Sequence, residues 1–158
     1  TSSKVMDEGM AAGLIGAATV AVWFLILDLF QGRPLFTPNV LGTALFGGGP
    51  AQIASPADLP LSFRMILTFT WVHGMVFVAF GGAAAWLVRL VERDPNYGFG
   101  IALLVVVFMF GVLGVSMVFA ESVLHTLTIP GILIGNLLAV VAMGAYFRKR
   151  HPNLTFHP

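Results

Sequence analysis

Four long runs of apolar residues constrain what this chain can fold into more than any other feature. The runs are 10–27, 65–88, 97–120 and 129–147, and none of them contains Asp, Glu, Lys or Arg. A bilayer has a hydrocarbon core of ~30 Å and needs ~20 helical residues to cross it. Only helices and closed barrels satisfy the backbone there. Because the runs are continuous rather than alternating, the sequence predicts four transmembrane helices.

The predicted fold class is therefore an all-α integral membrane protein, with 1–158 forming a single membrane domain. It is a four-transmembrane-helix bundle with a short interfacial helix in the first outer loop. The predicted spans are about 10–30, 64–91, 97–122 and 129–148, and the outer loop covers 31–63 with its short helix at 38–46. In that loop, Thr37 can cap the short helix and Pro38 can occupy its first position.

Composition excludes several other classes of protein. The chain has 58% hydrophobic and 9% charged residues, whereas a soluble domain has about 25% charged residues. A net charge of +1 with dispersed basic residues predicts no nucleic-acid partner. The absence of cysteine excludes a disulfide scaffold, a thiolate metal site and an iron–sulfur cluster held by this chain alone.

The distribution of Lys and Arg predicts the orientation. With four spans the two termini share one side, and the loops on the other side hold only Arg33 and Arg64. The terminal side collects the other six basic residues: Lys4, Arg89, Arg93, Arg148, Lys149 and Arg150. By the positive-inside rule, we expect both termini in the cytoplasm and a multi-pass protein of the bacterial inner membrane.

Small residues predict where the helices pack. Gly13 in the first run, and Gly131 and Gly135 in the fourth, are the expected interface positions, because small residues allow helix backbones to approach closely in lipid. Trp23, Trp71 and Trp86 are expected to anchor the helices at or near the membrane interfaces. The bulky residues of the third run are expected to face lipid or a partner: Val105, Val106, Phe108, Met109 and Phe110.

The candidate site residues are the few polar groups at membrane depth. Asp28, His73, Glu121 and His125 are expected in the outer half, where Asp28 and Glu121 form a polar membrane cluster. One hypothesis makes His73 and His125 ligands of a haem or chlorin, and Glu121 and His125 ligands of a metal. The simpler interpretation is a hydrogen-bonded group that orients the helix ends, with His73 bonded to a backbone carbonyl and Asp28 to the loop at Gly32 or Arg33.

No pattern in the chain predicts catalysis. There is no recognisable Ser, His and acid spacing and no repeated metal motif, so we expect a protein that is not an enzyme. A small transporter or channel remains an alternative, with Asp28, Glu121 and His125 as its outer vestibule.

Part of the sequence resembles a group of known proteins. The residues concerned are Gly13-Leu14-Ile15-Gly16, Trp23-Phe24, Asp28-Leu29, Gly32-Arg33-Pro34-Leu35, Thr37-Pro38 and Leu41-Gly42. This stretch resembles small uncharacterised four-helix inner-membrane proteins of bacteria. The resemblance implies the architecture and a bacterial origin, and it transfers no activity.

Together these features favour an accessory role. We expect a non-catalytic structural subunit of a larger bacterial bioenergetic complex, respiratory or photosynthetic, that stabilises the assembly through helix packing and bound lipid or pigment. Its expected partners are other membrane-protein subunits and the lipid bilayer. Binding of haem, chlorin or a metal, and transport, are the alternatives.

Overall fold

The fold is helical throughout the part of the chain that the computed structural model describes, residues 2–49, 53, 55–119 and 129–153. The main helices are α1 (Ser2–Phe30), α2 (Phe36–Phe46), α3 (Phe63–Arg93), α4 (Gly98–Phe119) and α6 (Ile129–Arg150). Two short 3₁₀ turns, η2 (Pro56–Asp58) and η3 (Pro95–Tyr97), precede α3 and α4. No strand occurs among these residues, so the all-α prediction is confirmed.

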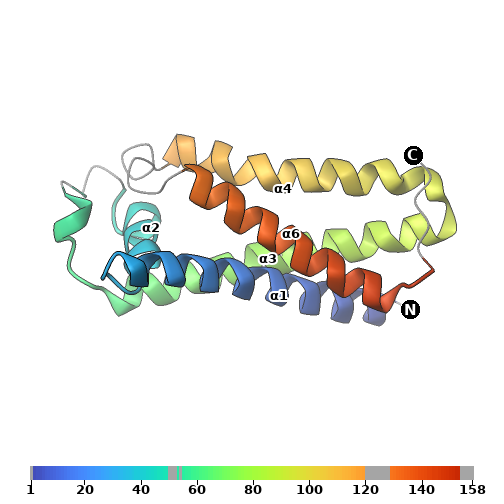
Figure 1. Ribbon diagram of the computed structural model, residues 1–158, viewed down its shortest axis with the longest axis horizontal. Helices are drawn as coiled ribbons and strands as arrows, with labels where there is room; N and C mark the ends of the chain where they lie inside the picture. Colours follow the sequence, from blue (N-terminus) through green and yellow to red (C-terminus); the bar gives the residue numbers. More distant parts are fainter. Residues whose placement is uncertain (1, 50–52, 54, 120–128, 154–158) are drawn as a thin grey trace.

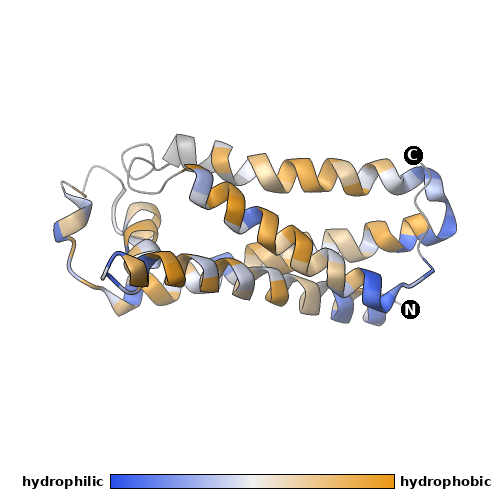
Figure 2. Cartoon of the chain, in the orientation of Figure 1, coloured by the Kyte–Doolittle hydropathy of each residue, from blue (hydrophilic) through white to orange (hydrophobic). Residues whose placement is uncertain are grey.

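The long helices lie along one common direction and α2 closes one end (Figure 1). α1 and α3 make the most extensive contact, α6 packs on α1, and α4 contacts α3 and α6 less extensively. α1 begins, and α3 and α6 end, at the end opposite to α2 (Figure 1). We call the end where α1 begins, and where α3 and α6 end, the charged end, because the polar colours of Figure 2 gather there. The opposite end, which α2 closes, is the capped end.

Three of the helices are long and apolar enough to cross a membrane. They are Ser3–Phe30, Phe63–Arg93 and Ile129–Arg150, judged by length and composition within the described residues. A shorter apolar stretch, Pro95–Gly111, lies at the start of the fourth long helix. The structure therefore supports a membrane-spanning protein with three spans by this criterion, and the fourth span remains a prediction.

Glycines allow α1 and α3 to touch backbone to backbone. A Cβ placed on Gly13 would lie 2.5 Å from the carbonyl oxygen of Phe77, and one on Gly81 would collide with the carbonyl oxygen of Gly9. No side chain larger than hydrogen fits at these positions without moving a helix. Gly13 therefore lies at a helix interface, which is where its sequence context predicts it.

The contact between α1 and α6 is organised around Trp23. The Trp23 indole Nε1 donates to the carbonyl oxygen of Gly131 at 2.8 Å, and a Cβ on Gly135 would lie 2.9 Å from Trp23 Cδ1. Gly131 and Gly135 thus lie at this interface. The Trp23 indole is bonded to α6, whereas Trp71 and Trp86 are exposed; that the three tryptophans anchor the helices at the membrane interfaces stays a prediction.

α4 is attached through one aromatic side chain above all. Phe108 is buried and packs edge-on against Phe77 and Phe80, with ring centroids 5.3 and 5.1 Å apart. Val106, Val107 and Phe110 remain exposed. The prediction that Phe108 faces outward is therefore wrong, because the outward and inward faces of an apolar run without periodicity look alike in sequence.

Two helices begin earlier than predicted. α1 begins at Ser2 instead of residue 10, so its first turns include the charged residues Lys4, Asp7 and Glu8. α2 begins at Phe36 instead of residue 38, which makes Thr37 its second residue and Pro38 its third. The prediction that Thr37 is the cap is wrong, since the cap comes from another helix.

Candidate functional site

Asp28 is a buried carboxylate that caps α2 from the end of α1. Its side chain is 2% exposed. The Thr37 backbone N–H donates to Asp28 Oδ2 at 2.8 Å, and the Thr37 hydroxyl donates to Oδ1 at 2.6 Å. The first N–H groups of a helix lack partners within the helix and favour negative charge. The Asp28 side chain meets both needs at Thr37, while its backbone carbonyl accepts from the Arg33 N–H at 2.9 Å.

Asn39 in α2 holds the residues just before α3 in place by hydrogen bonds from its side chain. This residue is buried, and its Nδ2 donates to the Pro60 carbonyl at 3.2 Å while its Oδ1 accepts from the Ser62 N–H at 2.9 Å. The Ser62 hydroxyl in turn caps α3 by accepting from the Met65 N–H at 3.5 Å. Sequence reasoning missed this role, because an Asn in a short amphipathic helix carries no sign of its partners.

His73 lies at the interface of α1 and α3. Its Nε2 is 3.3 Å from the carbonyl oxygen of Ala17. The ring stacks on Phe69 with centroids 5.7 Å apart and meets Phe77 at 4.7 Å. This is the backbone-bonded arrangement that the simpler interpretation describes. The other predicted haem ligand, His125, lies outside the described residues.

Glu121 also lies outside the described residues, so the metal pair Glu121 and His125 and the cluster of Asp28 with Glu121 stay predictions. Within the described ranges, His, Asp and Glu side chains form no group of three placed to hold a metal ion.

Like His73, Asn136 makes a polar contact between helices. Its Nδ2 is 3.4 Å from the carbonyl oxygen of Met109.

At the charged end, His151 bonds Glu8 of α1 and Glu92 of α3. We call this contact the three-helix tie, and the sequence did not predict it. His151 Nδ1 lies 2.5 Å from Glu92 Oε1, and His151 Nε2 lies 3.3 Å from Glu8 Oε2. A neutral imidazole has one N–H donor and the imidazolium has two, so only the imidazolium form can donate to both carboxylates. The carboxylates bond opposite ring nitrogens and so do not converge on a common point. No sequence signal links Glu8 to a histidine 143 residues away.

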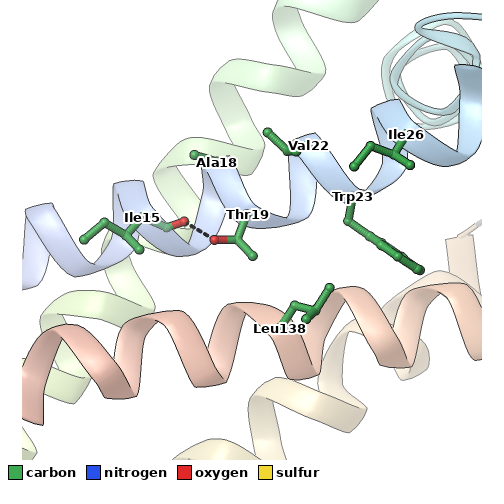
Figure 3. A pocket seen from close by; sticks show the side chains of 7 residues that line it. All are labelled: Ile15, Ala18, Thr19, Val22, Trp23, Ile26 and Leu138. Atoms are coloured by element: carbon green, nitrogen blue, oxygen red, sulfur yellow. Dashed lines mark hydrogen bonds between the residues drawn. The ribbon is translucent and has the colours of Figure 1, made fainter.

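An open apolar groove runs between α1 and α6 (Figure 3). Its volume is about 510 Å³, and it is lined by Ile15, Ala18, Thr19, Val22, Trp23, Ile26 and Leu138. The Thr19 hydroxyl donates to the Ile15 carbonyl at 2.7 Å and the Trp23 indole is bonded to Gly131. The groove is thus suited to an aliphatic chain and offers no group for catalysis.

Comparison of the chain with protein-family models, with curated proteins and with solved structures finds no match.

Proposed function

We propose that this protein is a non-catalytic accessory subunit of a larger bacterial membrane complex, of the respiratory or photosynthetic kind, and that it stabilises the assembly by helix packing and bound lipid. In this proposal it crosses the inner membrane four times with both termini in the cytoplasm. It belongs with the small four-helix bacterial proteins that part of its sequence resembles.

The observation that carries the proposal is how the polar side chains within the apolar spans are used. Those of Thr, Asp, His and Asn that the structure describes all bond inside the chain. The residues concerned are Thr19, Asp28, Thr68, Thr70, His73 and Asn136. Asp28 caps α2, and His73 and Asn136 join helices. The three threonines bond carbonyl groups of their own helices, so all six side chains are engaged within the fold and are not set out around a substrate.

The outer face of α4 supports the same proposal. The helix is apolar on all sides, which is typical of a helix enclosed by protein or lipid. Its attachment through Phe108 leaves Phe99, Leu103, Val106, Val107 and Phe110 exposed. A face with large aromatic and β-branched residues can pack closely against another helix, and we infer that it meets a neighbouring subunit.

Photocrosslinking in the native membrane tests this proposal. A photoreactive amino acid at Val106 or Phe110 should form one discrete crosslink to another membrane protein. The matched control is Leu67, which is 67% exposed on α3, where we expect crosslinks to lipid alone. Crosslinks to lipid alone at all three positions would contradict the proposal.

A second candidate function is binding of a haem or chlorin at His73. The Nε2 bond to Ala17 would fix the ring with Nδ1 as the lone-pair nitrogen, and a ligand histidine usually donates its other N–H in this way. A Cβ on Gly74 would meet nothing within 4 Å, so the helix surface next to His73 is open, although the ring itself packs against Phe69 and Phe77. A visible absorption band that disappears in His73→Gln would support this function, and a colourless protein purified from its native membrane would contradict it.

A further inference from the structure

The charged end carries an excess of cations, and three of its four acidic residues are engaged elsewhere. Six basic residues gather there with four acidic ones, Asp7, Glu8, Glu92 and Asp94. Glu8 and Glu92 bond His151, and Asp94 accepts from the Asn96 N–H at 3.0 Å. In the part of the chain that the structure describes, the two ion pairs within 4 Å are both made by His151. The Lys and Arg side chains there are therefore not neutralised by direct pairing with any residue that the structure describes.

Arg89 shows this most clearly. Its Nε is buried without a hydrogen-bond partner among the described residues. The Nε itself is out of reach of an external acceptor, but Arg89 as a whole is only half-buried, so the side chain is partly accessible from outside the chain. Guanidinium groups bind phosphate oxygens in a forked geometry and with charge assistance.

Arg148 lies at about the same depth as Arg89. Arg89 comes three residues before Glu92 in α3, and Arg148 comes three residues before His151, which follows α6. α3 and α6 run in the same direction (Figure 1) and Glu92 bonds His151. Three residues of helix rise about 4.5 Å, so both arginines lie roughly one turn inside the tie.

Aromatic residues place this level at the membrane interface. Trp86 and Tyr97 are 58% and 50% exposed, and they lie just before and just after the last turns of α3. Trp and Tyr are enriched at the depth of lipid headgroups. A phosphate at this depth belongs to a lipid, whereas nucleic acid and acidic peptides stay in the water beyond it.

We propose that the charged end binds the phosphate of anionic phospholipids, with Arg89 and Arg148 as the inner contacts and Arg150 as the outer contact. His151 is a positioning residue in this site, because it engages Glu8 and Glu92 and so leaves the arginines available for phosphate. The proposal does not depend on whether the protein joins a larger complex.

Lipid binding by the purified full chain tests the proposal. The readout is its preference for phosphatidylglycerol over phosphatidylcholine, measured by native mass spectrometry. A juxtamembrane cation contributes about fivefold in affinity, which corresponds to about 1 kcal/mol. We expect Arg89→Gln to lower the preference about fivefold and Arg148→Gln/Arg150→Gln to lower it further. The matched control, Arg33→Gln/Arg64→Gln, removes two cations from the capped end and should leave the preference unchanged.

The role of His151 gives the test a second arm. His151→Ala removes no Lys or Arg but frees two carboxylates, so it should lower the preference. Adding Glu8→Gln and Glu92→Gln to His151→Ala should restore it, which a merely structural loss would not allow. Circular dichroism checks that each variant is folded.

Three outcomes would overturn the proposal: no preference for phosphatidylglycerol in the unmodified chain, an equal loss in the control pair, or no rescue in the triple variant. Inorganic phosphate separates the two sources of this ligand chemistry. If millimolar phosphate binds at Arg89 while vesicles of the two lipids bind equally, the site is one for a soluble anion and not for lipid.

Discussion

Single buried polar residues do the work of joining elements in this protein. Asp28 and Asn39 are each 2% exposed and each hold the start of a segment that follows them in the chain. The cost of burying their polar atoms is offset by hydrogen bonds with good geometry. Trp23 joins α1 to α6 by the same principle, with one donor and a large apolar ring.

At the residue scale, Asp28→Ala should destabilise the capped end. The substitution leaves the first N–H groups of α2 without their acceptor, and loss of a helix cap costs about 0.5–2 kcal/mol. Thermal unfolding in detergent measures the loss, and Asp58→Ala, at an exposed site in the same loop, is the control. We expect less than about 0.5 kcal/mol for the control; equal effects for the two substitutions would show that Asp28 is not a cap.

Trp23→Phe tests the hydrogen bond to Gly131 apart from the packing of the ring. The change removes Nε1 and keeps an aromatic side chain, so the free energy of unfolding should fall by about 0.5–1.5 kcal/mol. Trp71→Phe is the matched control, because Trp71 is 71% exposed. A larger loss in the control than in Trp23→Phe would contradict the assigned contact.

At the scale of elements, close backbone contact holds α1 against α3 while larger side chains hold α4. Gly9, Gly13 and Gly81 bring two helices together without intervening side chains, an arrangement that gives van der Waals contact in lipid. α4 instead depends on the aromatic contacts of Phe108. The pair α1 and α3 is therefore the rigid part of the bundle.

Gly81→Ala and Gly82→Ala form a matched pair that tests this contact. Both changes should raise intrinsic helix stability by up to about 1 kcal/mol. A Cβ on Gly81 collides with Gly9, whereas one on Gly82 meets nothing within 4 Å. Gly81→Ala should therefore lower the free energy of unfolding by about 1–3 kcal/mol, and Gly82→Ala should be neutral or stabilising. Equal stability of the two variants would disprove the close approach.

The sequence predicts helices here better than it predicts contacts. Apolar runs are local and long, so the all-α fold and most helix positions follow from bilayer thickness. The hydrogen-bond partners of Asp28 and His151 could not be predicted from the sequence. Thr37 comes close to Asp28, and Glu8 to His151, only after the chain has folded. That Phe108 faces the inside of the bundle could not be predicted, because the apolar run that contains it has no polar side. Gly13 could be assigned since a small residue is conspicuous among bulky ones.

At the scale of the whole molecule, the two ends differ in charge and in construction. The capped end is closed by α2 and its buried carboxylate, and the charged end is held by His151 and surrounded by arginines. This asymmetry fits a protein with one fixed orientation in its membrane. It also separates a lipid-binding end from the apolar faces available to a partner.

Single-cysteine labelling tests the proposed four spans, and the natural absence of cysteine makes each substitution unambiguous. Asn96→Cys and Asn153→Cys should react with an impermeant reagent only after the membrane is permeabilised. In the proposed topology α4 and α6 each cross the membrane once, so both cysteines lie on the cytoplasmic side. Asp58→Cys should react in intact cells. Labelling of Asn96→Cys and Asn153→Cys from opposite sides would show that the fourth span is wrong.

The most direct test of the accessory role is purification from the native membrane in a mild detergent, followed by mass spectrometry of the subunits and a visible absorption spectrum. The proposed function predicts that this chain migrates with a stoichiometric set of larger subunits of a pigmented or haem-bearing complex. A colourless protein that migrates alone under these conditions would contradict it.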